Sequence, residues 1–180
     1  MSGNGYTYEY PRPMVTVDAV IFTLREEALH VLLIERRNEP FKGAWALPGG
    51  FVDIDEDLEE AVKRELEEET SLTDARLAQF HAFGKPGRDP RGRSIAVAYW
   101  GVVDAAHCQP GPGDDAAKAA WFRFSRIPKL AFDHNTIVAH AVQAVQAAIK
   151  SGGVGSAFLP ATFSPAECRL FRSALALAAG

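Results

Sequence analysis

The sequence predicts an α/β fold of the α/β/α sandwich type, with helices on both faces of a mixed β-sheet. Two observations carry this prediction. β-rich runs and amphipathic helical runs are mixed along the chain, an order typical of helices packed on a sheet. At 180 residues and 47% hydrophobic content, the chain is long enough for one complete core, and it shows no internal repeats. We therefore expect one main domain.

The first half of the sequence contains three predicted strands. Residues 15–24 and 28–37 are β-rich runs separated by the three charged residues 25–27, and they predict a hairpin. Residues 46–52 predict a short strand that is interrupted by a turn at Gly49-Gly50. This turn signal stands between the second strand and an acidic helical segment.

The second half of the sequence adds three further strands. β-rich runs cover residues 75–83, 94–103 and 119–124. The run over 94–103 is apolar almost throughout, which predicts a buried strand. Residues 84–93, rich in Gly, Pro and Arg, form the predicted loop between the first two of these strands.

Three segments have the apolar spacing of amphipathic helices. Residues 57–70 and 135–150 carry apolar side chains at offsets of three and four, and Asp133 is the predicted N-cap of the second helix. Ser164 and Glu167 form a predicted capping box that starts a last helix over residues 165–178, with Pro at its first position.

Three tyrosines stand near the start of the chain. Tyr6, Tyr8 and Tyr10 precede a Pro-Arg-Pro sequence, and they predict either an edge strand or an arm that packs on a partner subunit. The arm and the last helix provide more apolar edges than one small sandwich needs. The sequence therefore predicts a homodimer.

The acids of the first helix are spaced as well as abundant. Glu65, Glu68 and Glu69 stand at i, i+3 and i+4, so a helix places their carboxylates on one face. Clustered carboxylates repel each other, and hard divalent cations take such oxygen ligands. The alternative is a solvated helix face, which is the usual meaning of a charge run. The preceding strand and Gly-Gly turn favour a site for a metal ion and phosphates.

The charge of the chain is unevenly distributed. Its formal net charge is −4, yet residues 53–69 contain ten acids and two bases, a net charge of −8. The remainder is therefore mildly basic. An acidic patch in a basic body suits an anionic substrate that arrives together with a cation.

Several broad classes of protein are disfavoured by composition. Cys108 and Cys168 have no metal-binding spacing and are interpreted as reduced thiols. No apolar run approaches the roughly 20 residues that cross a bilayer. The first 13 residues lack the pattern of a secretory signal. We expect a cytoplasmic protein that does not interact with a membrane.

Residues 50–72 resemble the Nudix box, Gly-x5-Glu-x7-Arg-Glu-U-x-Glu-Glu-x-Gly-U, where U is a bulky apolar residue. The matching residues are Gly50, Glu56, Arg64, Glu65, Leu66, Glu68, Glu69 and Leu72. Ser71 stands where the family pattern has Gly. Gly commonly supplies a left-handed helix cap there, so Ser would strain the turn by up to about 1 kcal/mol.

The resemblance implies a Nudix fold and a set of catalytic residues. The carbonyl of Gly50 and the carboxylates of Glu65, Glu68 and Glu69 would hold Mg²⁺ or Mn²⁺, while Arg64 and Glu56 would orient the helix. The cations would neutralise a diphosphate and activate water, and a general base would assist. Candidates for that base are Glu68, Glu69, Asp114 and Asp115; for the two aspartates, a simple turn is the alternative.

The loop over residues 88–93 is a second candidate site. It holds Arg88, Asp89 and Arg91, and arginine forks bind phosphate in a bidentate manner. A turn with solvated arginines is the alternative. Arg36 is a further candidate contact for an anion. Phe41 and Trp45 would either stack on a base or ribose or pack in the core.

The resemblance is sharper for one branch of the family. Four segments carry it: residues 16–20, 40–52, 88–91 and 130–134. That branch contains ADP-ribose pyrophosphatases and related transcriptional regulators of NAD metabolism that sense ADP-ribose, and its members look dimeric. It implies hydrolysis of ADP-ribose, or a related nucleoside diphosphate derivative, to AMP and a phosphorylated sugar, ribose 5-phosphate in the case of ADP-ribose.

The alternative function is an ADP-ribose-sensing regulator, or a non-catalytic fragment of one. In the regulators a winged helix reads DNA, and residues 159–177 resemble only its opening helix. We expect a Nudix domain over residues 1–150 and a C-terminal helical extension over 151–180. The extension has two bases and one acid, too few for a surface that follows phosphates, so nucleic acid is not an expected partner.

Overall fold

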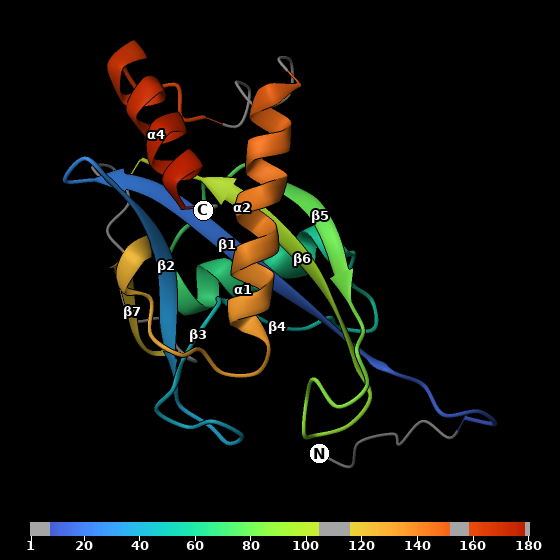
Figure 1. Ribbon diagram of the computed structural model, residues 1–180. Helices are drawn as coiled ribbons and strands as arrows, with labels where there is room; N and C mark the ends of the chain where they lie inside the picture. Colours follow the sequence, from blue (N-terminus) through green and yellow to red (C-terminus); the bar gives the residue numbers. More distant parts are fainter. Residues whose placement is uncertain (1–7, 105–115, 152–158, 179–180) are drawn as a thin grey trace.

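The computed structural model describes residues 8–104, 116–151 and 159–178. A seven-stranded sheet carries α1 on one face and α2 and α4 on the other (Figure 1). The predicted α/β/α sandwich is therefore confirmed. In chain order the elements are β1 (Met14–Arg25), β2 (Ala28–Arg36), β3 (Trp45–Ala46), β4 (Gly49–Phe51), α1 (Leu58–Thr70), β5 (Leu77–Phe83), β6 (Ser94–Val102), β7 (Ala116–Arg123), the 3-10 turn η1 (Phe124–Arg126), α2 (His134–Lys150) and α4 (Pro165–Leu177).

The sheet is mixed, as predicted. Its main path is β3-β2-β1-β6-β5, with β4 paired to β1 and β7 paired to β2. Strands β1 and β6 run parallel and the other pairs antiparallel. The expected hairpin is the β1–β2 pair, which begins with Arg25 opposite Ala28.

Strand β1 changes its partner halfway along its length. Phe22–Arg25 pair with β2, whereas Thr16, Val17 and Asp18 pair with β4. Strand β2 meanwhile continues alongside β3 and β7. The sheet therefore divides, and the segment between β3 and β4 crosses the division. This division positions the site described below.

The prediction for residues 46–52 was wrong in one respect. The interruption falls at Leu47-Pro48, and Gly49-Gly50 are strand residues of β4 that pair with Asp18 and Val17. Pairing with a distant strand overrides the local tendency of two glycines to turn. Gly49 nevertheless has a φ of +150°, a backbone conformation that glycine adopts readily.

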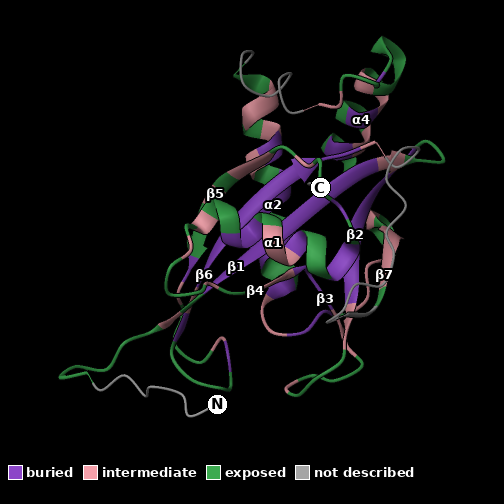
Figure 2. Cartoon of the chain, turned by 180° about the vertical axis from the view of Figure 1, so that it is seen from behind, coloured by how far each residue is buried: buried purple, intermediate pink, exposed green. Residues whose placement is uncertain are grey.

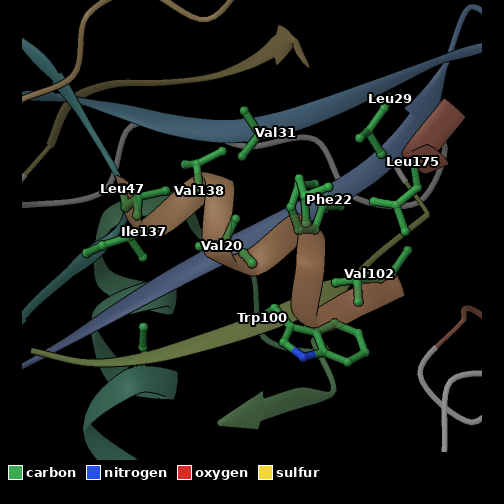
Figure 3. Packing of buried hydrophobic residues seen from close by; sticks show 14 of the residues in the cluster. Val20, Phe22, Leu29, Val31, Leu47, Trp100, Val102, Ile137, Val138 and Leu175 are labelled. Carbon is green, nitrogen blue, oxygen red and sulfur yellow. The ribbon is translucent and has the colours of Figure 1, made fainter. Parts of the chain in front are cut away.

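The two faces of β1 belong to two different core clusters. Val17, Ala19 and Ile21 pack with α1, while Val20 and Phe22 pack with α2 and α4, as the alternation of side chains along a strand requires. Figure 2 shows the buried central strands between exposed helix surfaces. In Figure 3, side chains from β1, β2, β6, α2 and α4 gather in the larger cluster.

Both ends of α1 lie where the sequence predicts them. Asp57 is its N-cap, and Asp57 and Glu60 complete a capping box, which stabilises the first turn. At the C-terminus, Ser71 is left-handed, with φ 62°. Ser71 therefore adopts the conformation for which the family pattern uses glycine.

The structure corrects two expectations about chain ends and caps. Asp133 stands at the N-cap position of α2, but its side chain makes no capping hydrogen bond and instead accepts from Arg88. Tyr8 and Tyr10 are exposed and not part of a strand, so the edge-strand alternative is wrong for the residues described. Tyr6 lies outside the described residues.

No helix in the described part of the chain is long and apolar enough to cross a membrane.

Helix α4 packs on the same core as the sheet. Phe171 and Leu175 are fully buried in the cluster that contains β1, β2 and α2. Gln146 of α2 donates a hydrogen bond to the carbonyl of Leu175 at 2.9 Å. The predicted capping box of Ser164 and Glu167 is present at the start of α4.

Two leucines of α4 test whether this helix shares the stability of the core. Leu175 is 1% exposed and Leu177 is 84% exposed. Leu175→Ala should lower the free energy of unfolding by about 2–5 kcal/mol, because it removes buried methyl groups and leaves a cavity. Leu177→Ala should change it by less than about 0.5 kcal/mol. Urea unfolding measures both, and equal effects would contradict this packing.

Candidate active site

Arg64 fastens the acidic helix to β4. Its Nε and Nη2 donate to the two carboxylate oxygens of Glu56 at 2.7 and 2.8 Å, and Nη2 also donates to the carbonyl of Phe51 at 3.1 Å. The hydrogen bonds from Arg64 lower the pKa of Glu56 and raise that of Arg64. A bidentate pair of this kind fixes orientation as well as distance. The predicted role of Arg64 and Glu56 in orienting the helix agrees with these contacts.

Glycine at position 50 allows Glu65 to lie against β4. A Cβ atom on Gly50 would lie 2.3 Å from Glu65 Oε1, closer than any real contact. Arg64 Nη1 donates to the same oxygen at 2.8 Å and holds the carboxylate in place. The carbonyl of Gly50 and the carboxylate of Glu65 thus belong to one site.

Gly49 and Glu69 make the second contact between β4 and α1. The backbone N–H of Gly49 donates to Glu69 Oε2 at 2.8 Å. A Cβ on Gly49 would lie 2.1 Å from the carbonyl oxygen of Val17. A side chain at Gly49 is therefore excluded by the backbone of the neighbouring strand, whereas a side chain at Gly50 would displace the Glu65 carboxylate.

The carboxyl group of Glu69 has a strongly perturbed pKa. Burial raises its pKa to about 8; the Gly49 N–H opposes that rise, and the charge of Glu65 adds to it. Burial disfavours a charged carboxylate that lacks a compensating cation. A cation bound beside it would favour the ionised form.

Glu68 is more accessible than the other two carboxylates. Its side chain is 44% exposed, and its Oε2 accepts from Arg64 Nη1 at 3.2 Å. It is therefore open to solvent at the edge of the site. Of the other general-base candidates, Glu69 is buried, and Asp114 and Asp115 lie outside the described residues.

A cleft of about 280 Å³ adjoins these groups. Its lining includes Arg36, Gly49, Gly50, Glu65 and Glu69. Among the residues described, no three His, Cys, Asp or Glu side chains converge on one point as a ready metal cluster. The cleft nevertheless offers oxygen ligands from the carboxylates of Asp53, Glu65 and Glu69 and from the Gly50 carbonyl, and oxygen ligands suit a hard cation such as Mg²⁺ or Mn²⁺.

The first arginine of the predicted loop is buried. Arg88 is bonded through both arms of its guanidinium to Asp133, at 2.6 and 3.0 Å, and its Nη2 lies 3.7 Å from Asp18 Oδ2. The interpretation of the loop as a turn with solvated arginines does not describe Arg88. A direct contact between Arg88 and a substrate stays a prediction. In the structure, Arg88 connects the loop to the start of α2 through Asp133.

Arg91 and Asp89 form a second, partly exposed pair. The backbone N–H, Nε and Nη2 of Arg91 all donate to the Asp89 carboxylate. Burial alone would raise the pKa of Asp89, but the bonds from Arg91 outweigh it and lower the pKa. The Arg91 guanidinium also lies 4.6 Å from the ring centre of Phe51 and 5.5 Å from that of Phe132.

Arg36 and Phe41 meet at Phe132. The Arg36 guanidinium lies 4.8 Å from the Phe132 ring centre, and Phe41 packs edge-on against the same ring at 4.8 Å. Phe132 has a φ of 52°, which is unusual for a bulky residue and typical of functional sites. Trp45 instead packs against Phe122, as expected of a core residue.

Sequence reasoning did not single out several residues beside this site. Asp18 and His134 are buried between β1 and the start of α2, with His134 Nε2 3.6 Å from Asp18 Oδ1. A charged residue at a core-facing position of an apolar strand was the signal available for Asp18. Phe132 and Asp133 lie in the segment 130–134 that carries the resemblance, but neither was assigned to the site, because only tertiary contacts bring them here.

Comparison with known proteins agrees with this geometry. Residues 12–141 match the model of the NUDIX domain. The chain belongs to the Nudix family. This confirms the predicted resemblance and makes the chain a Nudix hydrolase.

Three relatives are especially similar. An "ADP-ribose pyrophosphatase" of Methanocaldococcus jannaschii is 43% identical over 129 residues, 72% of this chain and 73% of that protein. An "ADPR responsive transcriptional repressor NtrR" of Acinetobacter baylyi is 33% identical over 88% of this chain and 65% of that protein. The NUDIX domain of Shewanella oneidensis NrtR, solved with ADP ribose, is 35% identical, with a TM-score of 0.70, over 79% of this chain and 94% of that one.

The buried carboxyl of Glu69 predicts a pH effect on the metal-free protein. The folded state keeps this proton up to about pH 8, while the unfolded chain releases it near the ordinary value of 4.5. Stability should therefore fall between pH 5 and pH 8, by at most about 5 kcal/mol. Glu69→Gln removes this contribution, so its stability relative to wild type should rise with pH.

Urea unfolding in EDTA at the two pH values provides the measurement. Glu67→Gln is the matched control, because Glu67 is an exposed acid on the same helix. Parallel pH profiles for wild type and Glu69→Gln would contradict the assigned burial effect.

Proposed function

We propose that this protein hydrolyses ADP-ribose to AMP and ribose 5-phosphate with the help of Mg²⁺ or Mn²⁺. The observation that carries the proposal is the complete set of box carboxylates, held against the β4 glycines by Arg64. The 43% identity to an ADP-ribose pyrophosphatase supports the choice of substrate. A related nucleoside diphosphate derivative would be hydrolysed by the same reaction.

The proposed roles follow the positions of the side chains. Glu65, Glu68, Glu69 and the Gly50 carbonyl hold the cation, and Arg64 and Glu56 keep the helix in register with β4. Bound divalent cations neutralise the diphosphate and lower the pKa of the attacking water. Glu68 is accessible enough to accept a proton from that water, as a general base must.

Four of the proposed substrate-binding residues, Arg36, Arg88, Asp89 and Arg91, line a cavity together with Gly49 and Gly50. Arg36 lines the cleft and is the proposed phosphate contact. Arg91 and Phe41 flank Phe132 and form the proposed rim of the site. Arg88 and Asp89 support that rim, since Arg88 is bonded to Asp133 and Asp89 to Arg91.

A second candidate function is an ADP-ribose-sensing regulator. The similarity to the Acinetobacter repressor covers 88% of this chain, although only 65% of the repressor. In the structure α4 packs on the sheet core, and its bases are Arg169 and Arg172 alone. Binding of ADP-ribose without turnover would favour this function.

Three further proposals concern the whole molecule. We propose a cytoplasmic homodimer with a Nudix domain over residues 1–150 and a helical extension over 151–180. Exposed apolar side chains near the start of the chain, among them Tyr10 and Val15, support a subunit contact. A mass measurement across protein concentrations tests it.

A substrate panel tests the proposed function. With Mg²⁺ or Mn²⁺, the protein should release AMP from ADP-ribose faster than from NADH, sugar nucleotides or diadenosine polyphosphates. EDTA should abolish the reaction, because the carboxylates cannot stabilise the diphosphate without a cation. Absence of turnover for every compound with both metals would refute the proposal.

Two glutamates of α1 provide the matched variants for this panel. Glu68→Gln removes a charge at the proposed metal site and should lower kcat at least about 100-fold, with the fold intact. Glu67→Gln changes an exposed neighbour and should keep the wild-type rate. Equal rates for the two variants at saturating metal would show that Glu68 has been misassigned.

A further inference from the structure

A small cavity opens beside the metal cleft, at the start of α2. Its volume is about 30 Å³, and six of its lining residues are charged or titratable: Asp18, Arg36, Arg88, Asp89, Arg91 and His134. The cavity shares Arg36, Gly49 and Gly50 with the cleft that the Glu65 and Glu69 carboxylates line. A group attached to a diphosphate in the cleft can therefore enter it.

Asp18 is the polar group of this cavity that lacks hydrogen bonds. It is 5% exposed, and its Oδ2 has no hydrogen-bond partner in the described part of the chain. The nearest cationic group, Arg88 Nη2, is 3.7 Å away, beyond hydrogen-bond distance. Burial raises the pKa of Asp18 even though His134 and Arg88 lower it. A buried carboxylate oxygen without a donor is rare and indicates a missing partner.

The neighbours of Asp18 are already committed to other groups. His134 Nδ1 accepts a hydrogen bond from the backbone N–H of Leu47 at 2.9 Å, so Nε2 carries the proton and faces Asp18 from 3.6 Å. Arg88 is held by Asp133 through both of its arms. At 3.7 and 3.6 Å, neither Arg88 Nη2 nor His134 Nε2 makes a hydrogen bond to Asp18. A hydroxyl group that enters the cavity can supply the missing donor.

The chemistry of the cavity selects a hydroxyl group. A cation is disfavoured, because three arginines and the His134 N–H face the cavity. An anion would be attracted by the arginines, but it could not donate to the Asp18 oxygen that lacks a partner. A neutral O–H donates to a carboxylate and accepts from an arginine, so it suits both. The volume of about 30 Å³ suits small groups such as hydroxyls.

We propose that this cavity is a subsite for the hydroxyl groups of the sugar on the distal phosphate, with Asp18 accepting one of their protons in a hydrogen bond. The subsite rests on the proposed function, since the cleft must hold the diphosphate. The distal sugar fits better than the adenosine ribose, because it carries no base that needs further space. The substrate class is thereby narrowed to nucleoside diphosphates joined to a small hydroxylated group.

A substrate analogue tests the subsite in the wild-type protein. The ADP ester of tetrahydrofurfuryl alcohol keeps the ring and the diphosphate of ADP-ribose but lacks the three distal hydroxyls. Its KM should be about 10- to 100-fold higher, as expected for loss of hydrogen bonds to a charged group. Equal KM values would overturn the subsite.

Asp18→Asn assigns the effect to this carboxylate. It keeps the size of the side chain, so it should raise KM for ADP-ribose about tenfold and leave KM for the analogue unchanged. Thr23→Val is the matched control, because it removes another buried polar group from β1, one that donates to the carbonyl of Val103. The control should keep the wild-type ratio of the two KM values. An equal rise for both substrates in Asp18→Asn would overturn the role of Asp18.

Binding measurements separate the subsite from the proposed reaction. Calorimetry with wild type should give a Kd for the analogue about 10- to 100-fold above that for ADP-ribose. If this difference holds while neither compound is hydrolysed, the hydrolase proposal fails and the subsite stands. If both are hydrolysed and bind equally, the subsite fails and the hydrolase proposal stands.

Discussion

The close contact between the β4 glycines and the α1 carboxylates is the constraint on which the site depends. Gly50 leaves space for Glu65, and the Gly49 N–H binds Glu69 at 2.8 Å. Arg64 keeps the helix at this distance through Glu56 and the Phe51 carbonyl. The division of the sheet at β1 is what brings β4 into reach.

The local part of this arrangement could be predicted from the sequence. The spacing of Glu65, Glu68 and Glu69 and the position of Arg64 follow from helix geometry alone. Long-range contacts could not be predicted. Pairing with β1 places Gly49 and Gly50 in a strand instead of a turn. Asp133 pairs with Arg88 instead of capping α2. Periodicity shows which side chains share a face, and it does not show which distant element covers that face.

The paired strands β1 and β4 contribute residues to two neighbouring cavities. On the α1 side, the glycines line a cleft together with carboxylates and arginines. Toward α2, Asp18 and His134 lie in a small polar cavity. His134 also holds the backbone of Leu47, just before the glycines. Leu47 in turn packs with Ile137 and Val138 of α2 (Figure 3). The start of α2 therefore stabilises the strand that carries the proposed metal ligands.

The most direct test of this account measures AMP release from ADP-ribose by Gly50→Ala. Its methyl group would lie 2.3 Å from Glu65 Oε1 and displace that carboxylate. Gly84→Ala is the control, because the nearest atom to its methyl group is 3.7 Å away. The account predicts that Gly50→Ala loses at least about 100-fold in kcat at saturating Mg²⁺, while Gly84→Ala keeps its activity. Wild-type turnover by a folded Gly50→Ala protein would contradict it.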